Sequence, residues 1–209
     1  MMQAHQNHTA SSVEIIFMAL SNDEALIERI AAALALRPRS SLQELAKAAG
    51  ISRATLYRFV PTREQLLSVL TGYAVSLMKR TLDEADLENG KPYGCLSHVT
   101  QAFLQHRDVY SFFFTHSVEE ALARGALYFA MPEWRFFDER MESFFLRCQK
   151  EGFLRIDMPA SWMNELYGSA VYGATRAVSL GRVAPVSAHD LVLNSFFNGV
   201  SAATAEINP

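Results

Sequence analysis

The sequence predicts an all-α protein made of two helical domains that share a long connecting helix. Apolar residues recur at three- and four-residue intervals through most of the chain, which is the pattern of helices with one buried face. Capping residues, glycines and prolines separate these stretches. The loop at residues 86–93 (DLENGKPY) is the best domain boundary. We therefore expect a flexible N-terminal segment (1–21), an N-terminal domain that includes the connecting helix (22–85), and a C-terminal helical domain (86–209).

The N-terminal domain is expected to begin with a supporting helix. Residues 21–24 (SNDE) have the form of a capping box, and the helix that follows is broken at residues 37–39 (RPR). A second capping box, made by Ser41 and Glu44, starts the next helix. Gly50 ends that helix, because glycine adopts the left-handed conformation of a helix end at little cost.

A third short helix follows after a tight turn and completes a helix-turn-helix. Ser52 is its predicted N-cap. Leu56, Phe59 and Val60 have the spacing of an inward face. The residues on the outward face are Arg53, Ala54, Tyr57 and Arg58. In a helix-turn-helix the second helix enters the major groove of DNA, so the outward face of this helix is predicted to meet the bases.

Charge is distributed unevenly along the chain. Residues 37–63 carry six basic side chains and one acidic side chain, whereas the whole chain has a net charge of −3. A basic patch on a helix-turn-helix is what phosphate contact requires. Charge alone would equally fit a solvated surface, and it is the combination with the helix spacing that predicts binding to double-stranded DNA.

The run LAKAAGISRATLYRFVPTREQLL (residues 45–67) resembles the DNA-binding domain of TetR/AcrR-type transcriptional regulators. Their usual pattern is roughly IA..AGVS.GTLY.YF.SKE.L. Departures from it that keep the character of the position include Ala54 for Gly, Phe59 for Tyr or His, Val60 for Phe, and Arg63 for Lys. The specific resemblance covers about residues 22–83, and beyond them only the layout of helices is similar. The resemblance implies a dimeric regulator with an effector pocket and a dimerisation surface in its C-terminal half.

The predicted DNA contacts lie on the helix-turn-helix and at the start of the connecting helix. Arg53 is the best candidate to read a base, because a guanidinium can bond to two acceptors of guanine. Tyr57 and Arg58 are expected to hold phosphates, and Arg63 matches the family lysine that contacts phosphate. The full predicted set is Ser41, Ser52, Arg53, Ala54, Thr55, Tyr57, Arg58, Thr62 and Arg63.

Aromatic residues concentrate in the first half of the C-terminal domain, where twelve fall between positions 103 and 145. For each one, plain core packing is the better interpretation. As a group they could line an apolar pocket between helices, and the resemblance implies such a pocket here. The predicted lining is Phe103, Tyr110, Phe113, Phe137, Phe144 and Tyr167. A small apolar or aromatic effector would suit these side chains.

The last two predicted helices cover about residues 159–180 and the stretch after residues 187–190 (SAHD), which again have the form of a capping box. The resemblance implies that these helices pair with their copies in a second subunit. The predicted interface residues are Ala170, Ala174, Phe196 and Phe197. A two-fold homodimer would bind a palindromic operator with half-sites one or more helical turns apart.

Other function classes find little support in the sequence. It contains no metal-ligand spacing, no glycine-rich phosphate loop and no nucleophile motif, so we expect no enzyme, no metal and no cofactor. The alternative within DNA-binding regulators is a redox sensor that uses Cys95 or Cys148. These two cysteines suit a reducing cytoplasm, and neither a signal peptide nor a membrane-spanning run is evident. The prediction is thus a cytoplasmic repressor that a small molecule releases from DNA.

Overall fold

The computed structural model describes residues 24–125 and 132–202. The predicted flexible segment at residues 1–21 and most of the first capping box lie outside them. Within the described ranges the chain is helical, as predicted. The helices are α2 (Glu24–Leu36), α3 (Leu42–Ala48), α4 (Arg53–Phe59), α5 (Arg63–Glu84), α6 (Pro92–Gln105), α7 (Arg107–Ala123), α8 (Pro132–Lys150), α9 (Ala160–Ser179) and α10 (Pro185–Val200).

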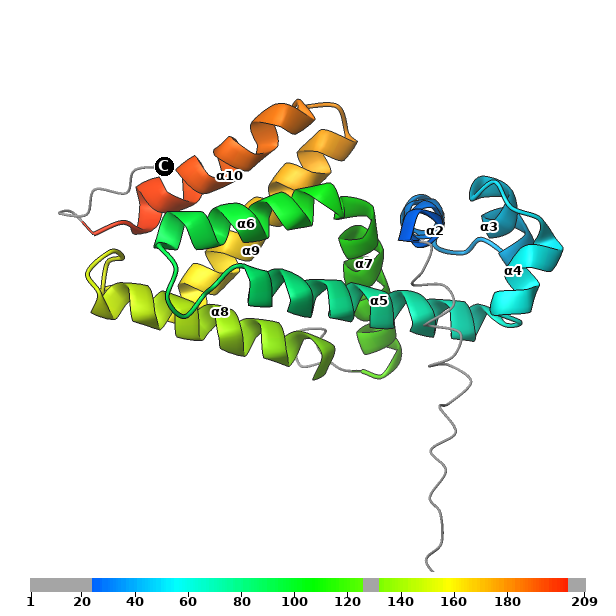
Figure 1. Ribbon diagram of the computed structural model, residues 1–209, viewed down its shortest axis with the longest axis horizontal. Coiled ribbons are helices and arrows are strands. Elements are labelled where there is room, and N and C mark those ends of the chain that lie inside the picture. Colours follow the sequence, from blue (N-terminus) through cyan, green and yellow to red (C-terminus); the bar gives the residue numbers. More distant parts are fainter. Residues whose placement is uncertain (1–23, 126–131, 203–209) are drawn as a thin grey trace, which may run out of the picture.

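Helices α2, α3 and α4 form the helix-turn-helix unit at one end of the molecule (Figure 1). Ser41 and Glu44 form the predicted capping box of α3, and Ser52 caps α4. Gly50 has a φ of 71°, the left-handed conformation that the turn between the two helices requires. Leu45 of α3 and Leu56 of α4 are fully buried. The local sequence signals therefore set both the ends of these helices and the faces that they pack together.

Helix α5 begins beside α4 and extends into the C-terminal half, where it lies next to α6 and α8 (Figure 1). Thr62 caps it, and its side chain accepts a hydrogen bond from the backbone N–H of Gln65. The turn between α5 and α6 holds Asp86, which has a φ of 49°. This turn coincides with the predicted domain boundary, although the division of the chain there stays a prediction.

Helix α7 crosses the molecule between its two ends and packs against α2 (Figure 1). Two polar contacts reinforce the attachment of α2 to the C-terminal half. Nδ1 of His106, at the junction of α6 and α7, lies 2.6 Å from Oε1 of Glu28, and Arg80 of α5 lies 3.6 Å from Glu24. Buried apolar residues from α2 to α10 form one continuous cluster, so the helix-turn-helix shares a core with the rest of the protein.

Helices α9 and α10 form an antiparallel pair that packs against α8 and α6. A buried hydrogen bond of 2.8 Å joins the hydroxyls of Tyr167 on α9 and Thr100 on α6. The predicted capping box at residues 187–190 is wrong. Helix α10 starts earlier, at Pro185, because proline's fixed φ suits the first turn of a helix, and Asp190 accepts from the ring of His189 instead.

Candidate functional site

The outward face of α4 is exposed as predicted. Arg53, Ala54, Tyr57 and Arg58 lie at the surface, whereas Leu56 is completely buried. Val60, just after the helix, is also buried, and the side chain of Phe59 lies outside the described residues. The guanidinium of Arg53 sits 4.8 Å from the centre of the Tyr57 ring, in a cation–π contact that holds both side chains on one face. Helix α4 has two arginines and no acidic residue.

The N-termini of α3 and α4 present capping serines beside this face. The Ser52 hydroxyl accepts a hydrogen bond from the backbone N–H of Thr55 at 3.0 Å, and the two hydroxyls lie 2.8 Å apart. The backbone N–H and hydroxyl of Ser41 both donate to the carboxylate of Glu44. These two bonds hold the pKa of Glu44 below its usual value. Ser41, Ser52 and the exposed Thr62 thus lie at the surface where the sequence predicts them.

Arg63 lies at the predicted helix end but is engaged within the protein. Its guanidinium donates to the backbone carbonyls of Pro38 and Ser40, in the loop between α2 and α3. The side chain is half-buried as a result. In this structure Arg63 therefore fixes the loop to the start of α5 and does not extend outward as a phosphate ligand would.

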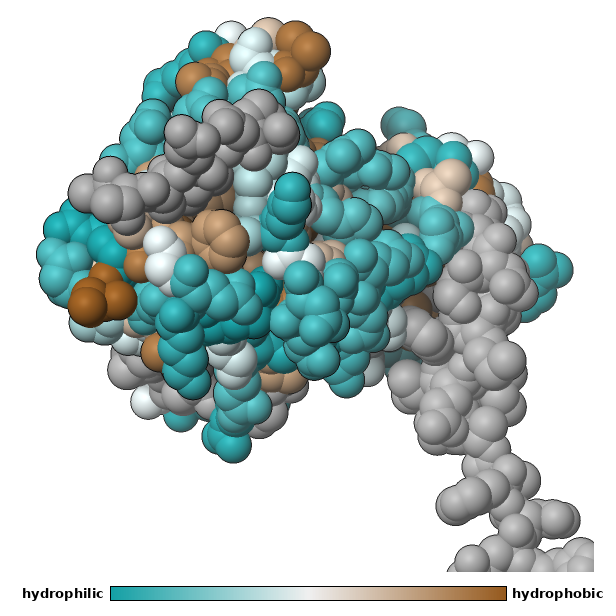
Figure 2. Space-filling view, turned by 60° about the vertical axis from the view of Figure 1, so that its left-hand side comes forward, coloured by the Kyte–Doolittle hydropathy of each residue, from teal (hydrophilic) through white to brown (hydrophobic). Residues whose placement is uncertain are grey.

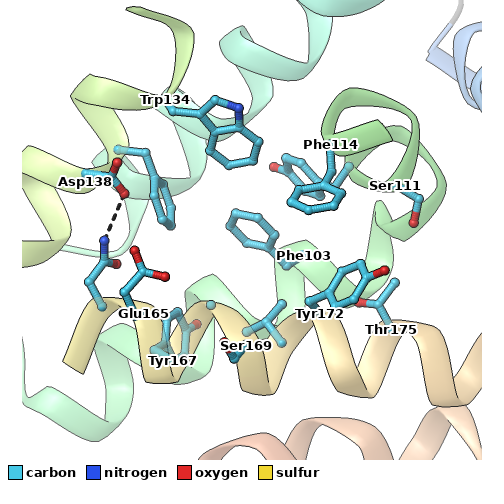
Figure 3. Close-up of a pocket in the computed structure, with 15 residues that line it drawn as sticks. Phe103, Ser111, Phe114, Trp134, Asp138, Glu165, Tyr167, Ser169, Tyr172 and Thr175 are labelled. Atoms are coloured by element: carbon cyan, nitrogen blue, oxygen red, sulfur yellow. Dashed lines mark hydrogen bonds between the residues drawn. The ribbon is translucent and has the colours of Figure 1, made fainter. Parts of the chain in front are cut away.

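A cavity of about 230 Å³ opens between α6, α7, α8 and α9 (Figure 3). Four of the predicted lining residues border it: Phe103, Tyr110, Phe137 and Tyr167. The rings of Phe103 and Tyr110 stack with their centres 4.1 Å apart. The other described lining residues are Ser111, Phe114, Trp134, Asp138, Asn164, Glu165, Gly168, Ser169, Val171, Tyr172 and Thr175.

Two of the predicted lining residues are core residues instead. Phe113 is fully buried against the Trp134 ring, whose centre lies 4.8 Å away, and Phe144 is buried beside Phe145. Neither borders the cavity. The sequence could not separate them from Phe114, because consecutive aromatic residues on a helix differ only in the direction that the neighbouring helices give them. Polar Asp138, Asn164 and Glu165 were missed altogether, since the prediction considered only aromatic residues.

The structure shows how α7 connects the cavity with the helix-turn-helix. Tyr110, Ser111 and Phe114 of α7 line the cavity, while the same helix packs against α2. None of the described lining residues belongs to α5. Helix α7 therefore contacts both the cavity and α2 of the helix-turn-helix unit.

The outer face of α9 and α10 differs from the predicted interface. Phe196 and Phe197 point into their own subunit and are buried among Phe145, Tyr167 and Tyr93. They are core residues, because this face of α10 packs against α9 and α6. Ala170 and Ala174 pack partly against the core. The exposed large apolar residues of this pair are Trp162, Tyr172, Leu180, Val186 and Leu191.

Several hydrophobic residues lie at the top of the face shown in Figure 2, at the height of the α9–α10 turn in Figure 1, and others lie lower on the left. Leu180 and Val186 flank this turn, with exposed fractions of 52% and 86%. Gly173, on the outer side of α9, has open space where a Cβ atom would stand. Exposed apolar residues next to a small residue are typical of a helical contact surface.

Comparisons with known proteins place this geometry in a family. No family model matches the chain. The transcriptional regulator NfxB of Pseudomonas aeruginosa, described as being of the helix-turn-helix type, is 34% identical over 185 residues, which cover 87% of this chain and 96% of that protein. The transcriptional repressor LfrR of Mycolicibacterium smegmatis is 24% identical over 157 residues, covering 75% of this chain and 79% of LfrR. The crystal structure of LfrR, a TetR-like regulator, in complex with proflavine matches with a TM-score of 0.63 and 22% identity, over 87% of this chain and 97% of that one.

The chain belongs to the TetR/AcrR family of transcriptional regulators. As a member of this family it is a DNA-binding regulator with a helix-turn-helix domain followed by a helical C-terminal domain. The predicted family resemblance is thus confirmed, and it extends beyond residues 22–83 to most of the chain.

The two cysteines of this TetR/AcrR regulator lie in the core. Cys95 and Cys148 are both buried and unpaired. Burial raises the pKa of the Cys148 thiol to about 12 and also raises that of Cys95. Because the thiolate is the form that reacts with oxidants, neither environment favours a redox sensor.

Three further residues of the regulator have an arrangement known from hydrolases. Ser97 Oγ lies 2.9 Å from Nε2 of His189, whose Nδ1 lies 2.9 Å from Asp190. His189 Nε2 also lies 3.3 Å from the Ser97 carbonyl, and neither described cavity is bordered by these residues. We assign this chain of bonds to the packing of α6 on α10.

Among the described residues, no group of acidic, histidine and cysteine side chains could hold a metal ion. No helix in the described ranges has the length and apolarity to cross a membrane.

Proposed function

We propose that this protein is a homodimeric repressor that binds a palindromic operator and leaves it when a small apolar or aromatic molecule enters the cavity. The observation that carries the proposal is the exposed face of α4, with Arg53 and Arg58 and no acidic side chain. A cationic helix that projects from a helix-turn-helix matches the negative potential of the major groove.

Each residue of this face has a proposed task. Arg53 bonds to a guanine edge, and its contact with Tyr57 fixes the direction of the guanidinium. Tyr57, Arg58, Thr55 and the capping serines contact phosphates and set the register of the helix without reading sequence. Ala54 is small and lets the backbone approach the floor of the groove. Arg63 keeps its hydrogen bonds to the two backbone carbonyls and stabilises the helix-turn-helix without contacting DNA.

Dimerisation through the outer face of α9 and α10 would present two copies of α4. Support comes from the exposed apolar residues Trp162, Leu180 and Leu191 and from the uncovered Gly173. When one copy of α4 binds its half-site, the other copy is held at high effective concentration near the second half-site. A small change in the distance between the two copies therefore lowers the affinity of the dimer for the operator strongly.

Release by an effector would proceed through α7. A ligand that pushes Tyr110 or Phe114 outward displaces α7, and α2 must follow because it packs on α7 and bonds to His106 through Glu28. LfrR, whose name describes a repressor, has been crystallised with proflavine, and that precedent supports a ligand-responsive repressor here. The coupling must be reciprocal, so operator DNA weakens effector binding by the same factor.

Fluorescence anisotropy with a labelled duplex from the DNA upstream of the regulator's own gene tests the proposal. We expect binding that weakens steeply as salt rises, because phosphate contacts release counterions. Arg53→Ala should cost about 1–3 kcal/mol of operator binding and relax the preference for operator over unrelated DNA. Arg135→Ala, which removes an exposed arginine from α8 outside the cavity lining and the proposed dimer face, is the matched control and should leave affinity unchanged. Absent or salt-insensitive binding by the wild-type protein would refute the proposal.

A further inference from the structure

The cavity between α6 and α9 has an uneven charge, and this observation deepens the proposed function on which it rests. Its described lining contains two carboxylates, Asp138 and Glu165, and no lysine, arginine or histidine. Both carboxylates lie at one end of the cavity, while Phe114, Ser111 and Tyr172 lie at the other (Figure 3). A ligand in this space therefore meets negative charge at one end and rings at the other.

The acidic end has unused hydrogen-bond acceptors. Asp138 accepts one bond, from Nδ2 of Asn164 at 2.9 Å. Neither Asp138 nor Glu165 forms an ion pair with a described residue, as the ion pairs of the described chain all involve other carboxylates. Asn164 is buried, and its side-chain oxygen receives no hydrogen bond from the part of the chain that the structure describes. The site thus offers acceptors that a ligand with N–H donors would satisfy.

The surroundings of Asp138 make its negative charge unfavourable, because they remove solvent while the described residues provide no cation. The carboxylate is half-buried, and loss of solvent raises its pKa above the usual value, with the Asn164 bond acting in the opposite direction. A half-buried carboxylate without a cation nearby is costly to ionise, and a bound positive charge removes that cost.

The aromatic end of the cavity favours positive charge as well. The Phe114 ring lies 5.2 Å from Tyr172 and 6.4 Å from Trp134, and Phe103 stacks on Tyr110. The faces of aromatic rings carry partial negative charge and attract cations, and they also stack on planar rings. The charged side chains and the ring faces of the described lining therefore favour the same sign.

We propose that the effector of this regulator is a planar organic cation that binds with its charged nitrogen at Asp138 and Glu165 and its ring system between Phe103, Phe114 and Trp134. A neutral aromatic molecule would leave the two negative charges uncompensated, and an anion would be repelled by both carboxylates. The charge of the ligand, and not only its aromatic character, decides whether it binds.

Three acridines of similar shape and different charge provide the test, with binding measured on the DNA-free protein by ligand fluorescence or calorimetry so that intercalation does not interfere. The probes are 9-aminoacridine, a cation at neutral pH, neutral acridone, and the anionic acridine-9-carboxylate. We expect 9-aminoacridine to bind most tightly. Asp138→Asn should weaken it by about ten- to a hundredfold, the range of a lost charge-assisted hydrogen bond. Glu165→Gln should weaken it less, because Glu165 is exposed and solvent screens its charge.

The control is Glu139→Gln, which neutralises an exposed carboxylate next to Asp138 in sequence but outside the cavity lining. Asp138→Asn keeps an oxygen for the Asn164 bond, and thermal unfolding shows whether each variant is folded. Equal binding of acridone and 9-aminoacridine, or no effect of Asp138→Asn, would overturn the cation inference and leave the proposed effector cavity in place. Failure of all three acridines to bind would also overturn it, while the operator titration judges the proposed function separately.

Discussion

Ser41 and Glu44 show how much a single pair of residues contributes to the helix-turn-helix. Their reciprocal bonds satisfy backbone and side-chain groups at the start of α3, which has no other N-terminal cap. Because α3 is only seven residues long, its stability depends strongly on this end. The same pair positions the surface that is proposed to face the DNA backbone.

Ser41→Ala should lower the free energy of unfolding by about 1 kcal/mol, the usual cost of a lost serine N-cap. The pKa of Glu44 is lowered in the folded state from its ordinary 4.5, so its contribution is complete above that pH and is lost as pH falls through the lowered pKa. The difference between wild type and Ser41→Ala should therefore shrink on acidification below about pH 4.5. Urea denaturation at several pH values measures this. Ser76→Ala, at an exposed position in α5, serves as control, and a difference that grows at low pH would contradict the account.

The residues that could be predicted are those whose partners are close in sequence. Ser41, Ser52 and Thr62 each cap a helix through a group three residues away, so the pattern alone identified them. Arg63 bonds to carbonyls 23 and 25 residues away, and only the packed structure reveals that it is engaged. Asp138 and Asn164 meet across two helices in the same way.

At the scale of elements, the turn between α5 and α6 is held by unusually close contacts. The backbone N–H of Gly90 donates to the carbonyl of Asp86, and Arg147 of α8 donates to the carbonyls of Leu87 and Gly90. A Cβ atom on Gly90 would stand 2.7 Å from the Cys95 sulfur and 2.9 Å from the Asp86 oxygen. This turn therefore requires glycine.

Gly90→Ala should destabilise the protein by about 1–3 kcal/mol, because the added methyl forces the turn away from Cys95 and Asp86. Gly94→Ala is the matched control, since it lies four residues later in α6 with open space around the new methyl group. It should be neutral or stabilise by up to about 1 kcal/mol, because alanine favours a helix more than glycine does. Thermal unfolding of both variants measures the pair. If Gly90→Ala matched Gly94→Ala in melting temperature, the close packing described for the turn would be wrong.

The helices of the N-terminal domain and the last two helices were predictable because their apolar periodicity is a local property, whereas no separate helix was predicted over Arg107–Ala123. The buried and exposed faces of a helix were predictable where one side is plainly polar, as in α4. They were not predictable in α7 and α10, where apolar residues surround much of the helix. There, tertiary packing alone decides that Phe114 borders a cavity and Phe113 does not, or that Phe196 and Phe197 turn inward.

At the scale of the whole molecule, the proposed dimer depends on a surface that the isolated subunit leaves uncovered. Trp162, Leu180, Val186 and Leu191 expose about half or more of their area on α9, α10 and the turn between them. Gly173 lies in the same helix and permits close approach of a second helix. Two of the predicted interface residues, Phe196 and Phe197, belong to the core, and the place of α9 and α10 in an interface stays a prediction.

Gly173→Arg should convert the protein into a monomer, because a long charged side chain would then occupy the proposed contact. The open space at Gly173 means that the subunit itself should stay folded. Gly94→Arg places the same side chain at an exposed glycine of α6 and is the control. Sedimentation velocity gives the oligomeric state, and operator affinity should fall together with dimerisation. A dimeric Gly173→Arg protein, or a monomeric wild type at micromolar concentration, would remove α9 from the interface.

Helix α7 lines the cavity and also packs against α2. A substitution in α7 can therefore affect both contacts, which restricts how the protein can evolve. If a ligand acts through α7 as proposed, substitutions at Tyr110 or Phe114 that admit a new inducer would also change the position of α2 and so the resting occupancy of the operator. Under that proposal, inducer range and background expression would not be independent traits, and a change that improves one would have to be balanced elsewhere in the chain.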